Sequence, residues 1–302
     1  MLFDAIVIGA GHNGLTAAAY LAKQSIRRVL VLEKRSIIGG AAVTEEIVNG
    51  FKFSRCSYLA GLLRPGVIKE LHLKEHGLKL LHRPHHSFTP SLLHKNESLL
   101  MSNDMSFTQR EIAKFSEKDA IQYPLYCQKL TKFANVLDSL IDSVPPQISA
   151  VPSLSEVNLK EHIESLKRLY PAMKGLSEKN DVSDFVSLLL SPAQNILDEY
   201  FESEILKATL ATDAVIGAMV SPQTPGSGYV LLHHVMNGGN WSYVEGGMGN
   251  ISNSIWKEAD RLGVEVRVNS DVGEIMIDEK DGSVSGVRLT TGEELCSNIV
   301  LR

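Results

Sequence analysis

The sequence has 302 residues, of which 44% are hydrophobic, and a formal net charge of −5. This length allows one large domain or two interleaved ones, and the charge gives no electrostatic basis for binding nucleic acid or an anionic membrane. No apolar run reaches the roughly 18 residues of a membrane-spanning helix. The three cysteines are widely spaced and predict buried thiols rather than a disulfide or a zinc site: Cys56, Cys127 and Cys296.

The first 33 residues have the order of a dinucleotide-binding βαβ unit. An apolar run at 5–8 enters the Gly-x-Gly-x-x-Gly turn Gly9-Ala10-Gly11-His12-Asn13-Gly14, and a helical pattern then continues to Gln24-Ser25. A second apolar run at 29–32 ends in Glu33. This agreement of strand, turn, helix, strand and terminal acid predicts a nucleotide site at the turn.

Each glycine of this turn has an expected role. Gly9 permits the tight turn, Gly11 lets the backbone approach a pyrophosphate, and Gly14 lets the helix pack closely on the strand. The helix that starts here offers N–H groups and the positive end of its dipole to phosphates. We expect Ala10, His12 and Asn13 to lie in the same phosphate turn, with His12 positional rather than catalytic.

Glu33 is expected to accept hydrogen bonds from ribose hydroxyls at the end of the second strand. A carboxylate there would repel a 2′-phosphate, so NADP is disfavoured and NAD or FAD is left. Lys34 and Arg35 follow directly, and Arg35 can lie over an adenine, pair with a phosphate or be a plain surface charge. The pair Gly39-Gly40, with Ala41, indicates a second close approach of backbone to cofactor.

The middle of the chain is expected to be short strands and loops to about residue 110, followed mainly by helices. His82, His85 and His86 share no regular spacing with acidic or thiol ligands, so a hydrogen-bonded cluster is favoured over a metal site. Thr108 and Glu111 are spaced as a capping box, and Ser116 with Asp119 can start a further helix. Its expected core positions are Ile121, Leu125, Leu130, Phe133 and Val136, and its expected end is Val144-Pro145-Pro146.

The last 60 residues return to a nucleotide-binding pattern. After the Gly-rich segment 241–249, a helix is predicted with Ile251, Ile255, Ala259 and Leu262 on one face and Gly263 as its cap. The alternation of Val264, Val266 and Val268 predicts a strand, and further short strands and turns continue to residue 301.

Several of these motifs resemble the phytoene desaturase and carotenoid isomerase group of flavoproteins. The matching segments are Gly9–Leu15, Glu33–Arg35, Gly39–Glu46, Gly50–Arg55, Phe201–Glu204, Leu206–Met219 and Pro225–Val235. The similarity runs nearly end to end and is weak from about 142 to 186. It implies FAD as cofactor, an adenine contact through the backbone of Val272, and a location in the mitochondrial matrix, with the cytoplasm as the alternative.

The predicted fold is therefore α/β, a doubly wound, Rossmann-like FAD-binding domain with a mainly helical inserted substrate lobe. The expected boundaries are 1–85 and 236–302 for the two parts of the FAD-binding domain, the second incomplete, and 86–235 for the insert. The resemblance implies relatives that continue through a long C-terminal portion covering the flavin. We therefore expect this polypeptide to keep the adenosine half of the site and to bind FAD more weakly than an extended one.

The leading functional hypothesis is an FAD-dependent oxidoreductase that passes a hydride from an apolar substrate carbon to the flavin. One alternative is a non-catalytic protein that keeps the fold and acts through protein partners. Another is an NAD-linked dehydrogenase, which the pairs Gly39-Gly40 and Gly246-Gly247 make less attractive. No catalytic acid or base and no metal ligand is identified in the sequence, and neither the substrate nor the electron acceptor is specified.

Overall fold

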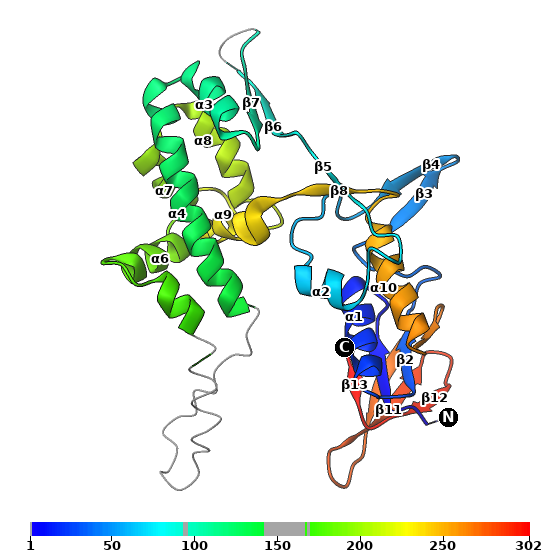
Figure 1. Ribbon diagram of the computed structural model, residues 1–302. Coiled ribbons are helices and arrows are strands. Elements are labelled where there is room, and N and C mark those ends of the chain that lie inside the picture. The colour runs from blue at the N-terminus through cyan, green and yellow to red at the C-terminus, as the bar shows by residue number, and fades with distance from the viewer. Residues whose placement is uncertain (1, 93–95, 142–166, 168–169) are drawn as a thin grey trace, which may run out of the picture. The chain divides into compact units, whose positions relative to one another are not determined.

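The computed structural model describes residues 2–92, 96–141, 167 and 170–302, and the chain divides into two compact units (Figure 1). The first unit comprises the residues up to 82 together with 241–302, and the second comprises 83–240. The first unit is thus built from two separate stretches of sequence. It contains β1 (Ala5–Ile8), α1 (His12–Lys23), β2 (Val29–Leu32), β3 (Thr44–Val48), β4 (Phe51–Ser54), α2 (Pro65–Glu70), β5 (Leu80–His82), β8 (Ser242–Val244), α10 (Gly249–Arg261), β9 (Glu265–Arg267), β10 (Val272–Ile277), β11 (Val284–Leu289), β12 (Glu294–Cys296) and β13 (Val300–Leu301).

A parallel sheet with the strand order β13-β1-β2-β9 forms the centre of this unit. The register pairs Ile6 with Leu30 and with Val300. Both β1 and β2 are buried nearly throughout, because the sheet is covered on its two faces. Since successive side chains point to opposite faces, each strand contributes to two separate cores.

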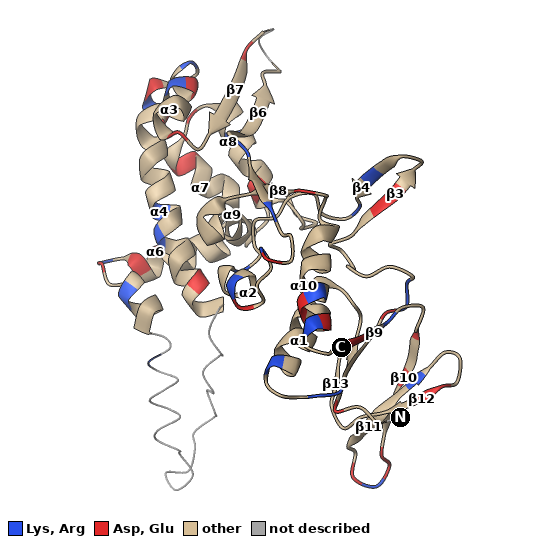
Figure 2. Ribbon diagram, turned by 45° about the vertical axis from the view of Figure 1, so that its right-hand side comes forward, with Lys and Arg blue, Asp and Glu red and all other residues tan. Residues whose placement is uncertain are grey.

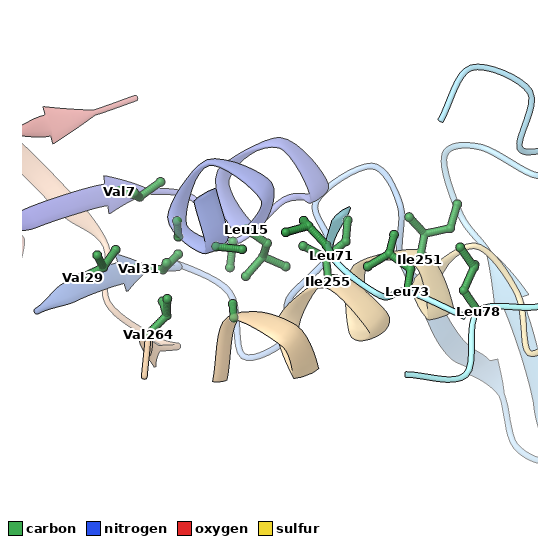
Figure 3. Close-up of a cluster of buried hydrophobic side chains, with 14 of the residues drawn as sticks. Val7, Leu15, Val29, Val31, Leu71, Leu73, Leu78, Ile251, Ile255 and Val264 are labelled. Atoms are coloured by element: carbon green, nitrogen blue, oxygen red, sulfur yellow. The ribbon is translucent and has the colours of Figure 1, made fainter. Parts of the chain in front are cut away.

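One face of the sheet packs on helices. Helices α1 and α10 lie side by side on it (Figure 1), and Leu15 from α1 meets Ile251 and Ile255 from α10 in a common apolar core with Val7 and Val31 of the sheet (Figure 3). The buried alanines of α1 carry little side-chain bulk, so the helices can approach closely. The predicted apolar face of α10 is confirmed.

The other face is covered by the antiparallel sheet β10-β11-β12 rather than by helices. This second core contains Phe3, Ile6, Leu30, Leu32, Val287, Leu289 and Leu295. Short alternating strands with tight turns at Asp281-Gly282 and Thr291-Gly292 form a meander, as the sequence pattern indicates. The predicted α/β, Rossmann-like class is confirmed.

A buried carboxylate ties α10 to the segment after α2. The Glu258 side chain is 1% exposed, and Arg261 donates two hydrogen bonds to it, at 2.8 and 2.7 Å. The imidazole nitrogens of His76 and His72 lie 2.7 and 3.3 Å from its two oxygens. The Arg261 guanidinium, followed by the two histidines, holds the pKa of Glu258 down to about 2.

The second unit is mainly helical. It contains β6 (His85–Pro90), β7 (Ser98–Ser102), α3 (Met105–Ala113), α4 (Glu117–Ile141), α6 (Asp181–Leu190), α7 (Ala193–Tyr200), α8 (Glu204–Ala211), η1 (Thr212–Ala214), α9 (Ser227–Val235) and η2 (Met236–Gly239). Its core forms along α4, where Leu130, Phe133 and Val136 are buried as predicted, and the Phe133 ring packs 5.5 Å from that of Phe185. The proposed core positions Ile121 and Leu125 are wrong, because both side chains are exposed.

Two local expectations in this unit have different outcomes. The predicted capping box at Thr108 is wrong, because α3 begins earlier and its N-cap is Asp104. The Thr108 hydroxyl is buried and donates a hydrogen bond to the Ser102 carbonyl. The start of α4 is confirmed, since the Ser116 hydroxyl accepts a hydrogen bond from the Asp119 N–H at 3.1 Å. The expected end of that helix, Val144 to Pro146, lies outside the described residues.

Two further expectations from the sequence can be compared with the structure. Cys56 and Cys296 are exposed and Cys127 is partly buried, so the expectation of three buried thiols is wrong; all three are free. Among the helices of the described segments, none combines the length and the apolar character needed to cross a bilayer.

Candidate dinucleotide-binding site

The Gly-rich turn connects the carboxyl end of β1 to the start of α1. Gly9 has a φ of +100°, which an L side chain rarely adopts, and Gly11 caps the helix with an extended backbone (φ −72°, ψ 169°). Within the described residues, no side chain caps α1, and its first turn holds no acidic residue. The start of α1 thus has neither a capping side chain nor a competing carboxylate, as an anion site requires.

The turn lies at the topological switch point of the sheet. From β1 the chain moves through β2 to β9 on one side, whereas β13 pairs with β1 on the other side. In open α/β sheets, ligands bind outside the carboxyl ends of the strands where the order reverses. The phosphate turn predicted from sequence therefore lies where such a fold places its ligand.

The glycines of this region differ in how much space the surrounding atoms leave for a side chain. A Cβ at Gly14 would lie 2.1 Å from the Gly9 carbonyl oxygen, and a Cβ at Gly39 would lie 2.5 Å from the carbonyl oxygen of Ala42. A Cβ at Gly11 would meet only the Cα of Gly40, at an ordinary 3.8 Å, among the described residues. The protein's own packing thus requires glycine at 14 and 39, whereas it leaves space beside Gly11.

The second glycine segment packs directly on the first. The Gly39 N–H donates to the Ala10 carbonyl at 2.7 Å, and Gly11 and Gly39 form a parallel bridge. The Ser252 hydroxyl of α10 donates to the Ala42 carbonyl at 2.8 Å and so holds the loop that contains Gly39 against α10. The structure therefore brings together the two glycine segments that the sequence singled out.

Glu33 is buried, with 6% of its surface exposed, and it braces the turn. Its Oε2 accepts the Ala10 N–H and its Oε1 accepts the Arg35 N–H, both at 2.9 Å. Each carboxylate oxygen has two lone pairs, and the described residues use only one on each. Glu33 can therefore still accept a hydrogen bond from a ribose hydroxyl. Sequence reasoning missed this bracing role, because it depends on how β2 and the turn are placed side by side.

The remaining predicted residues surround this centre. Lys34, Asn13 and Ala41 are exposed. Val272 begins β10 opposite Leu289, and the two N–H groups at 269 and 270 just before it donate to the carbonyls of Arg35 and Glu33 at 2.9 and 2.8 Å. Val272 is thus beside the end of β2.

His12 occupies the first position of α1. Its Nδ1 is buried and has no hydrogen-bond partner within the described part of the chain, and burial lowers its pKa. A neutral imidazole is therefore expected in this turn at neutral pH, so His12 adds no fixed positive charge for a phosphate.

The hairpin β3–β4 and the start of α10 also contribute to this region. The Thr44 hydroxyl accepts the Gly249 N–H at 2.9 Å, and the Ser54 hydroxyl accepts the Met248 N–H at 3.0 Å. These contacts hold the segment 241–249 in the first unit, as expected. Glu45 of β3 pairs with Arg35, a contact that sequence reasoning did not anticipate.

The candidate histidines are hydrogen-bonded or stacked. His82 lies 3.0 Å from the Ser242 hydroxyl, His86 contacts the Ser102 carbonyl at 3.1 Å, and His85 packs against the ring of Phe107. Over 2–92, 96–141, 167 and 170–302, no group of three or more His, Cys, Asp or Glu side chains could hold a metal ion. These histidines therefore provide no metal site in the described structure.

In the second unit, His234 and Asp213 form a separate acid–imidazole pair, with Nε2 and Oδ1 3.3 Å apart. Burial raises the pKa of Asp213 to about 6 and lowers the pKa of His234 to about 4. At neutral pH the histidine of this pair is therefore neutral while the carboxylate is charged.

The fold is of the Rossmann-like class, and a family model described as an NAD(P)-binding Rossmann-like domain matches residues 7–70. The chain is 46% identical over 310 residues to pyridine nucleotide-disulfide oxidoreductase domain-containing protein 2 of Rattus norvegicus, covering 99% of this chain and 52% of that protein. The Mus musculus protein of the same name gives the same values. The chain thus spans about half the length of the curated relatives it matches.

More distant similarities agree with this class. Phytoene desaturase of Cercospora nicotianae is 26% identical, with 98% of this chain and 44% of that protein covered, so the resemblance indicated by the motifs is confirmed. A solved oxidoreductase from Methanosarcina mazei superposes with a TM-score of 0.58 at 17% identity, covering 99% of this chain and 58% of that one. A putrescine oxidase gives 0.59 at 16% identity, covering 99% and 57%, which supports the fold.

Proposed function

We propose that this protein is an FAD-dependent oxidoreductase whose first unit holds the adenosine and pyrophosphate of the cofactor. One observation carries the proposal: the packing of the described residues leaves space beside Gly11, at the start of α1, where no side chain caps the helix. A pyrophosphate accounts for a glycine there, because backbone must approach it closely. The names of the similar proteins, which include oxidoreductases and desaturases, support the reaction class.

In this proposal each part of the turn has one task. The main chain at Gly11 and the first N–H groups of α1 bind the pyrophosphate, and Glu33 accepts the ribose hydroxyls while it keeps the turn in place. The backbone at Val272 contacts the adenine. Bound FAD supplies the acceptor for a hydride, whereas the protein orients the cofactor and excludes water.

The proposed substrate is an apolar carbon compound of the polyene or terpene kind, and the mainly helical unit is proposed to shape its site. Two relatives are named for hydrocarbons: phytoene desaturase, and a component of the limonene dehydrogenase of Castellaniella defragrans that is 28% identical to this chain. We propose no catalytic base. A place in the mitochondrial matrix also remains a proposal, tested by fractionating cells that express the natural protein.

The absorption spectrum of the purified protein tests the cofactor. Bound FAD gives the visible bands of an oxidised flavin, and these bands should bleach when a substrate of the right class reduces it. The description of the matched family model favours an NAD-linked dehydrogenase as the second candidate. A colourless protein that is stabilised against heat by NAD and not by FAD would replace the first proposal with the second.

A further inference from the structure

We propose that Glu45 sets the specificity of this site for an adenosine nucleotide without a 2′-phosphate, because it holds Arg35 away from the ribose. The inference rests on the proposed nucleotide site and adds to it a residue that excludes one class of ligand. It places NADP-type nucleotides outside the range of the site and leaves FAD- or NAD-type nucleotides within it.

The position of Arg35 makes it a potential receptor for a 2′-phosphate. It follows Glu33 by two residues, its N–H donates to the Glu33 carboxylate, and its carbonyl accepts the Asn269 N–H at 2.9 Å. Its backbone is therefore fixed at the end of β2, where the ribose of a bound adenosine lies in this fold. Dinucleotide-binding proteins that accept a 2′-phosphate use an arginine near this point.

The guanidinium of Arg35 is instead committed to the hairpin β3–β4. Its Nη2 lies 2.5 Å from Oε1 of Glu45, and Nη1 of Arg55 lies 3.1 Å from the other oxygen. Only 20% of the Glu45 side chain is exposed, against 34% for Arg35. Figure 2 shows the acidic part of β3 beside the basic part of β4. A phosphate would have to displace this carboxylate to recruit the arginine.

The hairpin holds Glu45 in place through its neighbours. Thr44 precedes Glu45 and pairs across the hairpin with Ser54. The hydroxyls of both residues accept N–H groups at the start of α10, at 2.9 and 3.0 Å. Glu45 therefore does not need to be ordered by the ligand, and its hold on Arg35 exists before binding. Glu33 disfavours a 2′-phosphate by direct repulsion, whereas Glu45 acts by removing the cation that would attract it.

The test compares two ligands that differ only in the group at issue, ADP-ribose and 2′-phospho-ADP-ribose. Calorimetric titration gives the ratio of their affinities for the wild-type protein and for Glu45→Gln. We expect the preference for ADP-ribose to fall about fivefold or more in the variant, because the freed arginine can now bind the 2′-phosphate.

The matched control is Glu46→Gln. This change removes the same charge from the next residue of β3, where the carboxylate accepts the Gly50 N–H at 2.8 Å. The control should keep the wild-type ratio. The double variant Glu45→Gln with Arg35→Ala should return to the wild-type ratio, because the gain requires the arginine.

Three results overturn the inference: an unchanged ratio in Glu45→Gln, an equal change in Glu46→Gln, or a changed ratio that persists without Arg35. If Glu45→Gln does not fold, Glu45→Ala, which also removes the carboxylate, provides the same comparison. A wild-type protein that binds neither FAD nor ADP-ribose would instead overturn the proposed function, and this inference with it.

Discussion

Replacing Gly11 with alanine should weaken cofactor binding and leave the stability of the fold almost unchanged. The backbone at Gly11 has φ −72° and ψ 169°, a conformation open to any L residue, and the added methyl would meet only the Gly40 Cα, at 3.8 Å, among the described residues. Alanine is a poorer N-cap than glycine, which lowers stability. Alanine also reduces the conformational entropy of the unfolded chain, which raises stability by about 0.4–1 kcal/mol. We therefore expect a net change in the free energy of unfolding within about 1 kcal/mol, and a Tm shift of about 4 °C at most.

Binding should respond differently. The methyl group occupies the space through which the pyrophosphate reaches the main chain, so charge-assisted hydrogen bonds worth about 1.5–3 kcal/mol each are lost or lengthened. Losing one such bond weakens FAD binding by about tenfold or more. Fluorescence titration of the apoprotein with FAD measures this loss, and circular dichroism with a thermal melt measures the fold.

The control is Gly14→Ala, in the same turn. Its methyl would lie 2.1 Å from the Gly9 carbonyl oxygen, so the helix must shift from the strand, at a cost of about 1–3 kcal/mol or more. This variant should lose stability as well as binding. Wild-type FAD affinity in Gly11→Ala would refute the pyrophosphate site, and a large loss of stability in that variant would refute the steric argument.

Glu33→Ala should weaken FAD binding by about tenfold or more. It should also lower the Tm, because two backbone N–H groups lose a buried acceptor worth about 1–3 kcal/mol. An unchanged FAD affinity in titration would show that Glu33 is not part of the site. The depressed pKa of Glu258 gives stability that is present above its ordinary value of 4.5 and is lost as the pH falls toward about 2. Urea unfolding across this range should show a steeper loss for the wild type than for Glu258→Gln, and parallel curves would contradict this assignment. The raised pKa of Asp213 shows that its charge is unfavourable in this partly buried place above pH 6. Asp213→Asn should therefore raise the Tm there, and the gain should become smaller as the pH falls from 6 to 3.8. An equal gain at both ends of that range in thermal melts would show that the carboxylate's charge is not the cause.

The sequence by itself determined the local parts of the nucleotide unit. The apolar runs at 5–8 and 29–32, the glycine spacing in 9–14 and the acid at 33 are all short-range signals, and each element formed where they indicated. The amphipathic face of α10 and its end at Gly263 followed from the same kind of pattern. Local sequence is enough here because backbone geometry and side-chain period act within a few residues.

Only the tertiary structure decided which distant groups meet. Glu33 accepts an N–H 23 residues away, and Arg35 is held by a carboxylate on a neighbouring hairpin. The space beside Gly11 depends on where the loop at Gly40 lies. The helix α4 shows the same limit, since Ile121 and Leu125 have a suitable spacing but stay exposed among the described residues. Such contacts depend on the packing of segments far apart in the chain, and the sequence pattern of one segment contains no information about the position of another.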